Sequence, residues 1–155
     1  MFRISILTLC MSLASTSSAA LTAAVLESGI FEKSERSSED VLIQGKETVK
    51  SEKIVPGLIG QKFGVRFTLS DPVKTDHEVT FLYLTPGIVH PDGSRHDKYE
   101  VSKILSSSTP SHAIAFEFTD RWEIRFGTWE MFVFEGDRLL LRERFEVVVP
   151  EDVLR

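Results

Sequence analysis

Apolar residues recur at every second position in several short stretches of this chain. The clearest stretch is Lys62–Ser70, where four apolar side chains alternate with small or polar ones: Phe63, Val65, Phe67 and Leu69. Because successive side chains of a β-strand point to opposite faces, this period of two predicts a strand with one buried face. The same pattern predicts a strand over residues 112–118, with Ile114, Phe116 and Phe118 facing inward.

Further strands follow from shorter apolar runs that end at turn residues. A tight turn predicted at residues 135–138 joins strands 127–134 and 139–149 into a hairpin. Two residues predict local irregularities. Gly29 indicates a bulge or bend, and Glu143, which shares the parity of inward-facing neighbours, indicates a bulge or an edge. The remaining predicted strands cover residues 22–31, 48–54, 78–84 and 99–105.

Polar, serine-rich or proline-containing segments separate these strands and are predicted as connections. They cover residues 32–40, 86–97, 106–111 and 119–125, and the second contains a Pro-Asp-Gly-Ser turn at 91–94. Seven or eight short strands without an amphipathic helix predict an all-β fold. An antiparallel β-sandwich is favoured, and a small β-barrel is the alternative.

The first twenty residues have the pattern of a secretory signal peptide helix. Arg3 precedes an apolar run over residues 4–13, which is too short to span a bilayer. Ser18-Ala19-Ala20 matches a small-x-small cleavage site, so we expect cleavage after Ala20, with Ala19 as second choice. A retained membrane anchor is the alternative, but no stop-transfer pattern follows. The expected organisation is a signal peptide at 1–20 and one β-sandwich domain at 21–155, located in the periplasm or secreted.

Composition narrows the classes of partner. The chain has 42% hydrophobic and 26% charged residues, as in ordinary globular domains, so disorder throughout is disfavoured. Its formal net charge of −5, which becomes −6 without Arg3, argues against nucleic acid and anionic lipid as partners. The single cysteine, Cys10, lies in the predicted signal. The mature chain is therefore expected to form no disulfide and no Cys-type metal site.

Five groups of motifs span nearly all of the mature chain: VLESGIF, KFGVRFTL, HPDG followed by KYEV, FTDRWEI, and GTWEMFVFEGDRLLLRERFEVV. Together they resemble one bacterial family, described as domain of unknown function 3859. The resemblance implies an exported bacterial domain with an immunoglobulin-like sandwich. It implies no activity, no cofactor and no catalytic residues.

One loop gathers residue types that bind metals. His90 and His96 flank a segment that also holds Asp92 and Asp97. Imidazole and carboxylate groups are common metal ligands, so the four side chains are candidates for a metal site. The spacing matches no established metal signature, and the alternative is a turn whose polar groups face water.

An aromatic run is the strongest single feature. It comprises five side chains within thirteen positions: Trp122, Phe126, Trp129, Phe132 and Phe134. An exposed subset could stack on a sugar ring or anchor a protein partner, and Trp122 and Trp129 are the named candidates. The alternative is that these side chains fill the core of a domain without disulfides.

Three classes of function remain from these patterns. The favoured one is a non-enzymatic exported module that binds an envelope protein or component through an exposed sheet edge or the loops at one end. The second is a binder of a small ligand, either a carbohydrate or a metal. The third is an enzyme, which should show a concave pocket that gathers two or more ionisable side chains. Serines beside His112 do not form a nucleophile elbow.

Overall fold

The structure is a computed structural model that describes residues 20–32 and 47–150. This part consists almost entirely of β-strands and one short 3₁₀ helix, η1 (Arg121–Glu123). The strands are β1 (Thr22–Glu32), β2 (Thr48–Lys50), β3 (Ile54–Pro56), β4 (Lys62–Ser70), β5 (Asp76–Val89), β6 (Arg95–Ser106), β7 (His112–Glu117), β8 (Gly127–Glu135) and β9 (Arg138–Val148). No helix among the described residues has the length and apolar character needed to cross a membrane.

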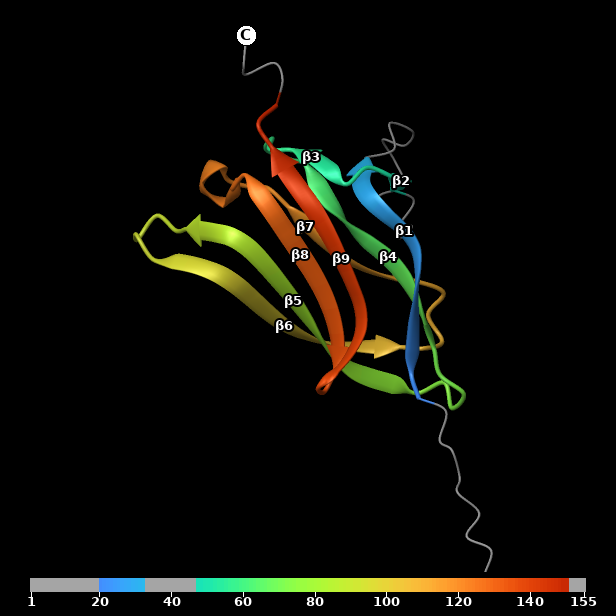
Figure 1. The fold of residues 1–155 in the computed structure, drawn as a ribbon. Helices are drawn as coiled ribbons and strands as arrows, with labels where there is room; N and C mark the ends of the chain where they lie inside the picture. The colour runs from blue at the N-terminus through green and yellow to red at the C-terminus, as the bar shows by residue number, and fades with distance from the viewer. Residues whose placement is uncertain (1–19, 33–46, 151–155) are drawn as a thin grey trace, which may run out of the picture.

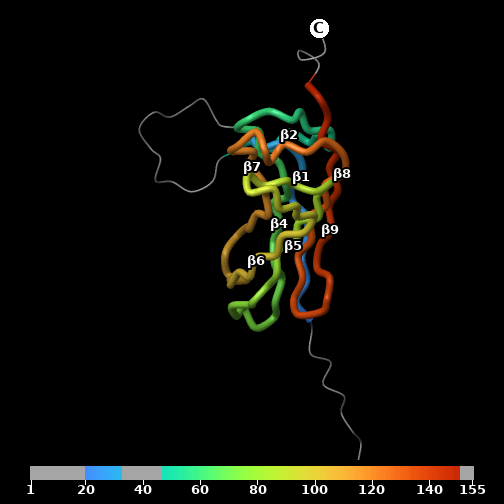
Figure 2. The backbone as a smooth tube through the Cα atoms, turned by 90° about the vertical axis from the view of Figure 1, so that its left-hand side faces the viewer, coloured from blue at the N-terminus to red at the C-terminus, as the bar shows by residue number. Residues whose placement is uncertain are grey.

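The strands form two sheets that pack face to face. One sheet has the order β2-β1-β4-β7 and the other the order β3-β9-β8-β5-β6. All neighbouring pairs are antiparallel except β3 and β9, which run parallel. Figure 1 shows the two layers obliquely, and Figure 2 shows β8 and β9 on one side with β4 and β7 on the other. The predicted sandwich is confirmed, and the sheets do not close into a barrel.

The core lies between the sheets and is rich in aromatic rings. The ring of Phe63 on β4 lies 5.3–5.6 Å from the rings of Phe118, Trp129 and Phe145. Of the inward side chains predicted for β4 and residues 112–118, Phe63 and Ile114 have no exposed surface, whereas Phe116 is partly buried against the core. The alternation of apolar residues therefore identified the inward face of this sheet correctly.

Residues 48–56 form two short strands where the sequence predicted one. β2 pairs with β1 in the first sheet, whereas β3 pairs with β9 in the second. The chain thus crosses from one sheet to the other between Lys50 and Ile54. This crossover has no apolar periodicity of its own, and it helps to raise the number of strands to nine.

The prediction of a loop at residues 86–97 was wrong for most of these residues. β5 continues to Val89 and β6 begins at Arg95, so only a short turn remains. A register shift between Leu84 and Ile88 absorbs the Pro86-Gly87 pair as an irregularity within the strand. Gly87 has φ 103°, which a residue with a side chain rarely adopts. A proline-glycine pair can therefore lie inside a long hairpin.

Two predicted irregularities have different outcomes. Of the bulge or bend expected at Gly29, the bulge is wrong, because the register of β1 shifts between Val25 and Glu27. Gly29 instead allows close approach of β2, since a Cβ there would lie 1.9 Å from the carbonyl oxygen of Lys50. The edge alternative for Glu143 is confirmed, because β3 covers β9 only from Glu146 onward.

Three predicted features fall partly or wholly outside the described residues. They are the signal peptide, of which residues 1–19 are not described, most of the loop at 32–40, and the end of the chain from residue 151.

Candidate functional site

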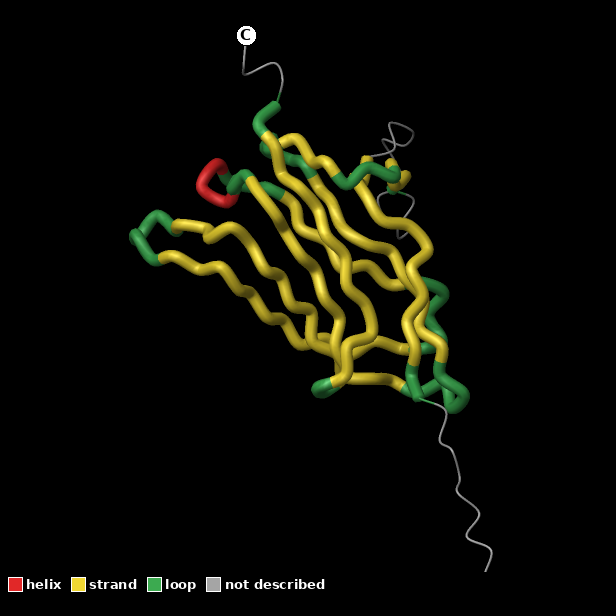
Figure 3. The backbone as a smooth tube through the Cα atoms, in the orientation of Figure 1, coloured by secondary structure: helices red, strands yellow, loops and turns green. Residues whose placement is uncertain are grey.

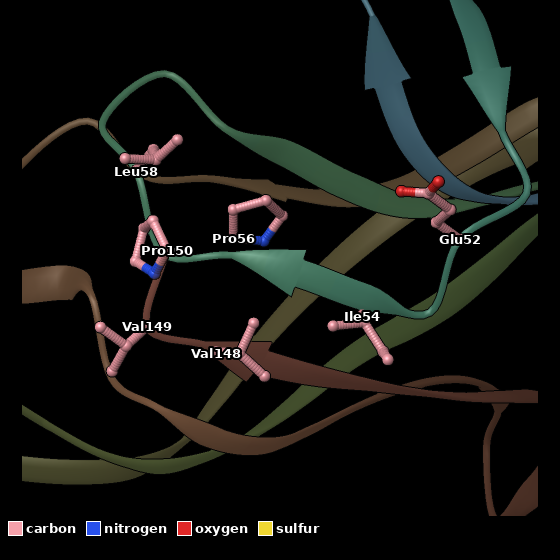
Figure 4. Close-up of a pocket in the computed structure, with 7 residues that line it drawn as sticks. All are labelled: Glu52, Ile54, Pro56, Leu58, Val148, Val149 and Pro150. Atoms are coloured by element: carbon pink, nitrogen blue, oxygen red, sulfur yellow. The ribbon is translucent and has the colours of Figure 1, made fainter. Parts of the chain in front are cut away.

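A hollow lies beside β3, where β3 and β9 end at the same edge of the sandwich. Its volume is about 490 Å³, and its walls are mostly hydrocarbon (Figure 4). The lining residues come from β3, the turn after it and the end of β9: Glu52, Ile54, Pro56, Leu58, Val148, Val149 and Pro150. Apolar walls with few polar groups are typical of binding sites.

A second hollow adjoins the first and shares Leu58, Val149 and Pro150 with it. It extends the apolar surface towards the segment between η1 and β8. Several side chains there are exposed despite being apolar: Ile54 is 63% exposed, Ile59 51% and Phe126 50%. We call the joined area the apolar end surface, defined by Ile54, Leu58, Ile59, Phe126, Val149 and Pro150. Contiguous exposed apolar groups are uncommon on soluble proteins and mark interaction sites.

Gly57 shapes this surface by having no side chain. A Cβ at Gly57 would lie 2.7 Å from Cε1 of Phe126 and 2.8 Å from Cγ2 of Ile124. The glycine therefore allows the Phe126 ring to lie directly over the turn that follows β3. The same loop is fixed to the end of β7, because the Gly60 N–H donates to the Phe118 carbonyl at 2.7 Å.

Among residues 20–32 and 47–150, no strand pairs with the outer edge of β3 beside the hollow. The Lys53 carbonyl accepts from the Glu146 N–H at 2.8 Å, and the Gly57 N–H donates to the Val148 carbonyl at 2.9 Å. Odd-numbered residues thus bond to β9, so the peptide groups of Ile54 point away from it. An incoming strand could pair with Ile54, although only over a short length because Pro56 has no N–H.

Two other sheet edges, those at β6 and β7, differ from β3. On β6, the exposed Ile104 lies among charged residues, including Lys98 and Lys103, which disfavour pairing with another strand. At the edge of β7, the Tyr83 hydroxyl donates to the Ala115 carbonyl at 3.2 Å. The edge at β3 thus combines a free peptide group with adjoining apolar hollows.

Ionisable side chains gather in a hollow at the opposite end of the sandwich. The two ring nitrogens of His77 lie 2.8 Å from Asp71 and 2.9 Å from Glu135. Hydrogen bonding to Asp71, and secondarily to Glu135, raises the pKa of His77. Hydrogen bonds from the Thr75 and Val73 N–H groups, and then from His77, hold the pKa of Asp71 well below its usual range.

An enzyme requires a cluster of ionisable side chains of this kind, but the hydrogen-bonding groups of this cluster are already bonded to one another. Both ring nitrogens of His77 have carboxylate partners, and the nearby Thr75 hydroxyl donates to Asp71 at 2.9 Å. A general base needs a ring nitrogen that is free to accept a proton from a nucleophile. The arrangement instead links the β4–β5 connection to the end of β8.

The histidines predicted as metal ligands lie at the tip of the β5–β6 hairpin. The rings of His90 and His96 are 5.0 Å apart between centroids. Hydrogen bonds from the Ser94 hydroxyl and N–H are the main cause that lowers the pKa of Asp92, and the nearby histidines contribute. Asp97 directly follows His96 in β6. Among the described residues, no group of three or more His, Cys, Asp and Glu side chains is placed to hold a metal.

The two tryptophans have different environments. Trp129 is fully buried, and its indole N–H donates to the Arg125 carbonyl at 2.8 Å, so its position fits the core alternative. Trp122 is partly buried, with its ring 4.6 Å from that of His90. Figure 3 shows its helical turn beside the hairpin tip. Glu123 holds this turn by accepting from the Thr119 and Asp120 N–H groups at 2.6 and 2.9 Å.

The apolar end surface was mostly missed at the level of sequence. Phe126 belonged to the aromatic run, but Ile54, Leu58 and Ile59 were not singled out. The available signal was the pair Leu58-Ile59 directly after Pro56-Gly57, since two large apolar residues in a turn are unusual.

The fold is similar to that of a solved structure. The chain is similar to an immunoglobulin-like protein (PA1606) from Pseudomonas aeruginosa, with a TM-score of 0.71 and 39% sequence identity. The match covers 85% of this chain and 99% of that one. No curated protein matched the sequence.

Two other structural matches have TM-scores below 0.5 and 14% identity, so neither supports a conclusion about the fold or the function of this chain. The alkylpurine DNA glycosylase AlkC from Pseudomonas fluorescens has a TM-score of 0.40, covering 61% of this chain and 27% of that one. A putative lipoprotein from Bacillus anthracis has a TM-score of 0.33, covering 79% and 85%.

The match to the Pseudomonas protein confirms the immunoglobulin-like sandwich that the sequence motifs implied. A family model agrees with it and covers residues 20–147. The chain therefore belongs to the family described as Domain of unknown function (DUF3859).

Proposed function

We propose that this protein is a non-enzymatic, exported binding module that docks an extended apolar segment of an envelope protein at the apolar end surface. The observation that carries the proposal is the position of β3. Its free edge borders two adjoining hollows, with Ile54, Ile59 and Phe126 each at least half exposed. A peptide in extended form can pair with such an edge while its alternate side chains enter the adjoining hollows.

Export is part of the proposal and rests on the first twenty residues of the sequence. Leu21 is buried and Thr22 begins β1. A chain cleaved after Ala20 would thus keep every residue that this sheet uses. Since the predicted mature chain has no cysteine, the periplasm and the exterior are both compatible with its stability.

Affinity capture with matched variants tests the proposal. Phe126→Asp and Ile54→Asp place a charge on the apolar end surface, whereas Val73→Asp places one on an apolar side chain that is 74% exposed at the opposite end. We expect the first two variants to lose an envelope protein that wild type and Val73→Asp retain. Thermal unfolding of all four proteins verifies that they are folded. Equal capture by all folded variants would contradict the proposed surface.

A further inference from the structure

The tip of the β5–β6 hairpin carries a cluster of rings that the proposed docking surface does not use. The strands pair as Ile88 with His96 and Val89 with Arg95, and the His90 N–H donates to the Ser94 carbonyl at 2.8 Å. Ile88 is buried, so its partner His96 lies on the face of the hairpin that turns inward. His90 lies diagonally opposite on the same face, which explains why the two rings meet.

The separation of these two rings fits a shared metal ion. A metal–nitrogen bond of about 2.0–2.1 Å would place the centroids of two imidazoles on one ion about 4.5–5 Å apart, for angles between square-planar and tetrahedral. The observed centroids are 5.0 Å apart and the rings are nearly perpendicular, at 89°. This separation is compatible with two imidazoles that share one ion.

The hydrogen bond made by His90 also fits a metal ligand. Nε2 of His90 lies 2.8 Å from the Tyr99 hydroxyl, so this partner can fix the ring and leave Nδ1 for an ion. Histidines that bind metals commonly have the second ring nitrogen held in this way. Asp92, in the turn between the two histidines, adds negative charge beside the pair.

We propose that His90 and His96 bind a borderline divalent transition metal, with Cu²⁺ the tightest of the series. Only two protein nitrogens are supplied, and water completes the coordination. Such ions accept imidazole ligands, and the usual order of affinity places Cu²⁺ above Ni²⁺ and Zn²⁺. The partly buried ring of Trp122, 4.6 Å from that of His90, lies within quenching range of the bound ion.

Titration of the purified protein, without a polyhistidine tag, tests this site. Added Cu²⁺ should quench the Trp122 fluorescence with one-to-one saturation, and electron paramagnetic resonance of the complex should show histidine nitrogen ligands. His96→Asn should raise the dissociation constant for Cu²⁺ at least tenfold. Tyr99→Phe should raise it about 10–100-fold, as loss of a hydrogen bond that supports a metal ligand does in other proteins.

Two further variants show whether the ion binds at this cluster or at another histidine. Trp122→Phe should abolish the saturable quench but keep the resonance spectrum. His112→Gln, which alters a histidine on β7 outside the cluster, should bind as wild type does. An absence of saturable binding, or equal binding by His96→Asn, would overturn the proposal. The apolar end surface shares none of these side chains, so the two proposals can fail independently.

Discussion

Trp129 and Phe126 lie three positions apart and have opposite environments. Trp129 is fully buried among aromatic rings, whereas Phe126 is 50% exposed over Gly57. The difference arises because Trp129 is an inward residue of β8, whereas Phe126 precedes the strand and lies outside its alternation. Both residues are aromatic, and their exposure distinguishes them. Trp129 is part of the core, whereas Phe126 is part of the proposed docking surface.

Trp129→Ala should lower the free energy of unfolding by about 3–5 kcal/mol, because it removes a large side chain from a packed core. Phe126→Ala should cost about 1 kcal/mol or less, since half of the ring is already in water. Equilibrium denaturation in urea measures both changes. A loss below about 1 kcal/mol for Trp129→Ala, with the fold intact, would contradict the assignment of Trp129 to the core.

Gly57→Ala should reshape the apolar end surface without unfolding the protein. The new Cβ would meet the ends of the Phe126 and Ile124 side chains, which can move, rather than backbone atoms. We expect a cost of about 1–3 kcal/mol from this overpacking and reduced capture of the partner. Urea denaturation and affinity capture check the two parts. Wild-type capture with a displaced Phe126 ring would show that this ring is not part of the docking surface.

At the scale of the elements, Gly64 allows β4 and β7 to approach closely. A Cβ there would lie 2.2 Å from the Ile114 carbonyl oxygen, which belongs to the backbone and cannot rotate away. Gly64→Ala should therefore separate β7 from β4 and destabilise the protein by about 3 kcal/mol, at the upper end for overpacking. Hydrogen exchange of the β7 amides should accelerate. Unchanged protection of these amides would refute the prediction.

The ionic link around His77 should make stability depend on pH. The pKa of His77 is raised by Asp71 and then Glu135, so its contribution is full below about pH 6.5 and is lost as the pH rises through the folded-state pKa. The pKa of Asp71 is lowered, so its contribution is present above about pH 3.9 and is lost as the pH falls through the folded-state pKa.

His77→Gln isolates this effect. Between pH 6 and pH 8.5 the free energy of unfolding of wild type should fall more than that of His77→Gln, because glutamine cannot gain a proton. Urea denaturation at the two pH values measures the difference. Parallel pH dependence in the two proteins would show that the link between Asp71, His77 and Glu135 contributes nothing.

Sequence patterns were sufficient for elements whose face is buried along their whole length. β4 was predicted with its observed bounds because Phe63, Val65 and Phe67 alternate without interruption. Tertiary pairing determined the rest. β2 and β3 are three residues each and exist because β1 and β9 offer partners. The β5–β6 hairpin continues past Pro86-Gly87 because the register shifts between Leu84 and Ile88. From the sequence alone, a proline-glycine pair predicts the end of a strand.

On the scale of the whole molecule, the two ends of the sandwich have different chemistry. One end joins its connections through Asp71, His77 and Glu135, and the other exposes apolar side chains around β3. The sequence predicted a sandwich and a binding role at an edge or an end. It could not locate the apolar end surface, because this surface is assembled from residues near positions 54–59, 126 and 149–150. Their proximity depends on the parallel pairing of β3 with β9.

Photocrosslinking in living cells tests whether the apolar end surface contacts a protein partner. A photoreactive amino acid replaces Leu58 on this surface or, as the control, Val73 at the opposite end, both of which are exposed. We expect one envelope protein to be crosslinked from position 58 and not from position 73. Identical products from both positions, or none from position 58 in a folded and abundant protein, would contradict it.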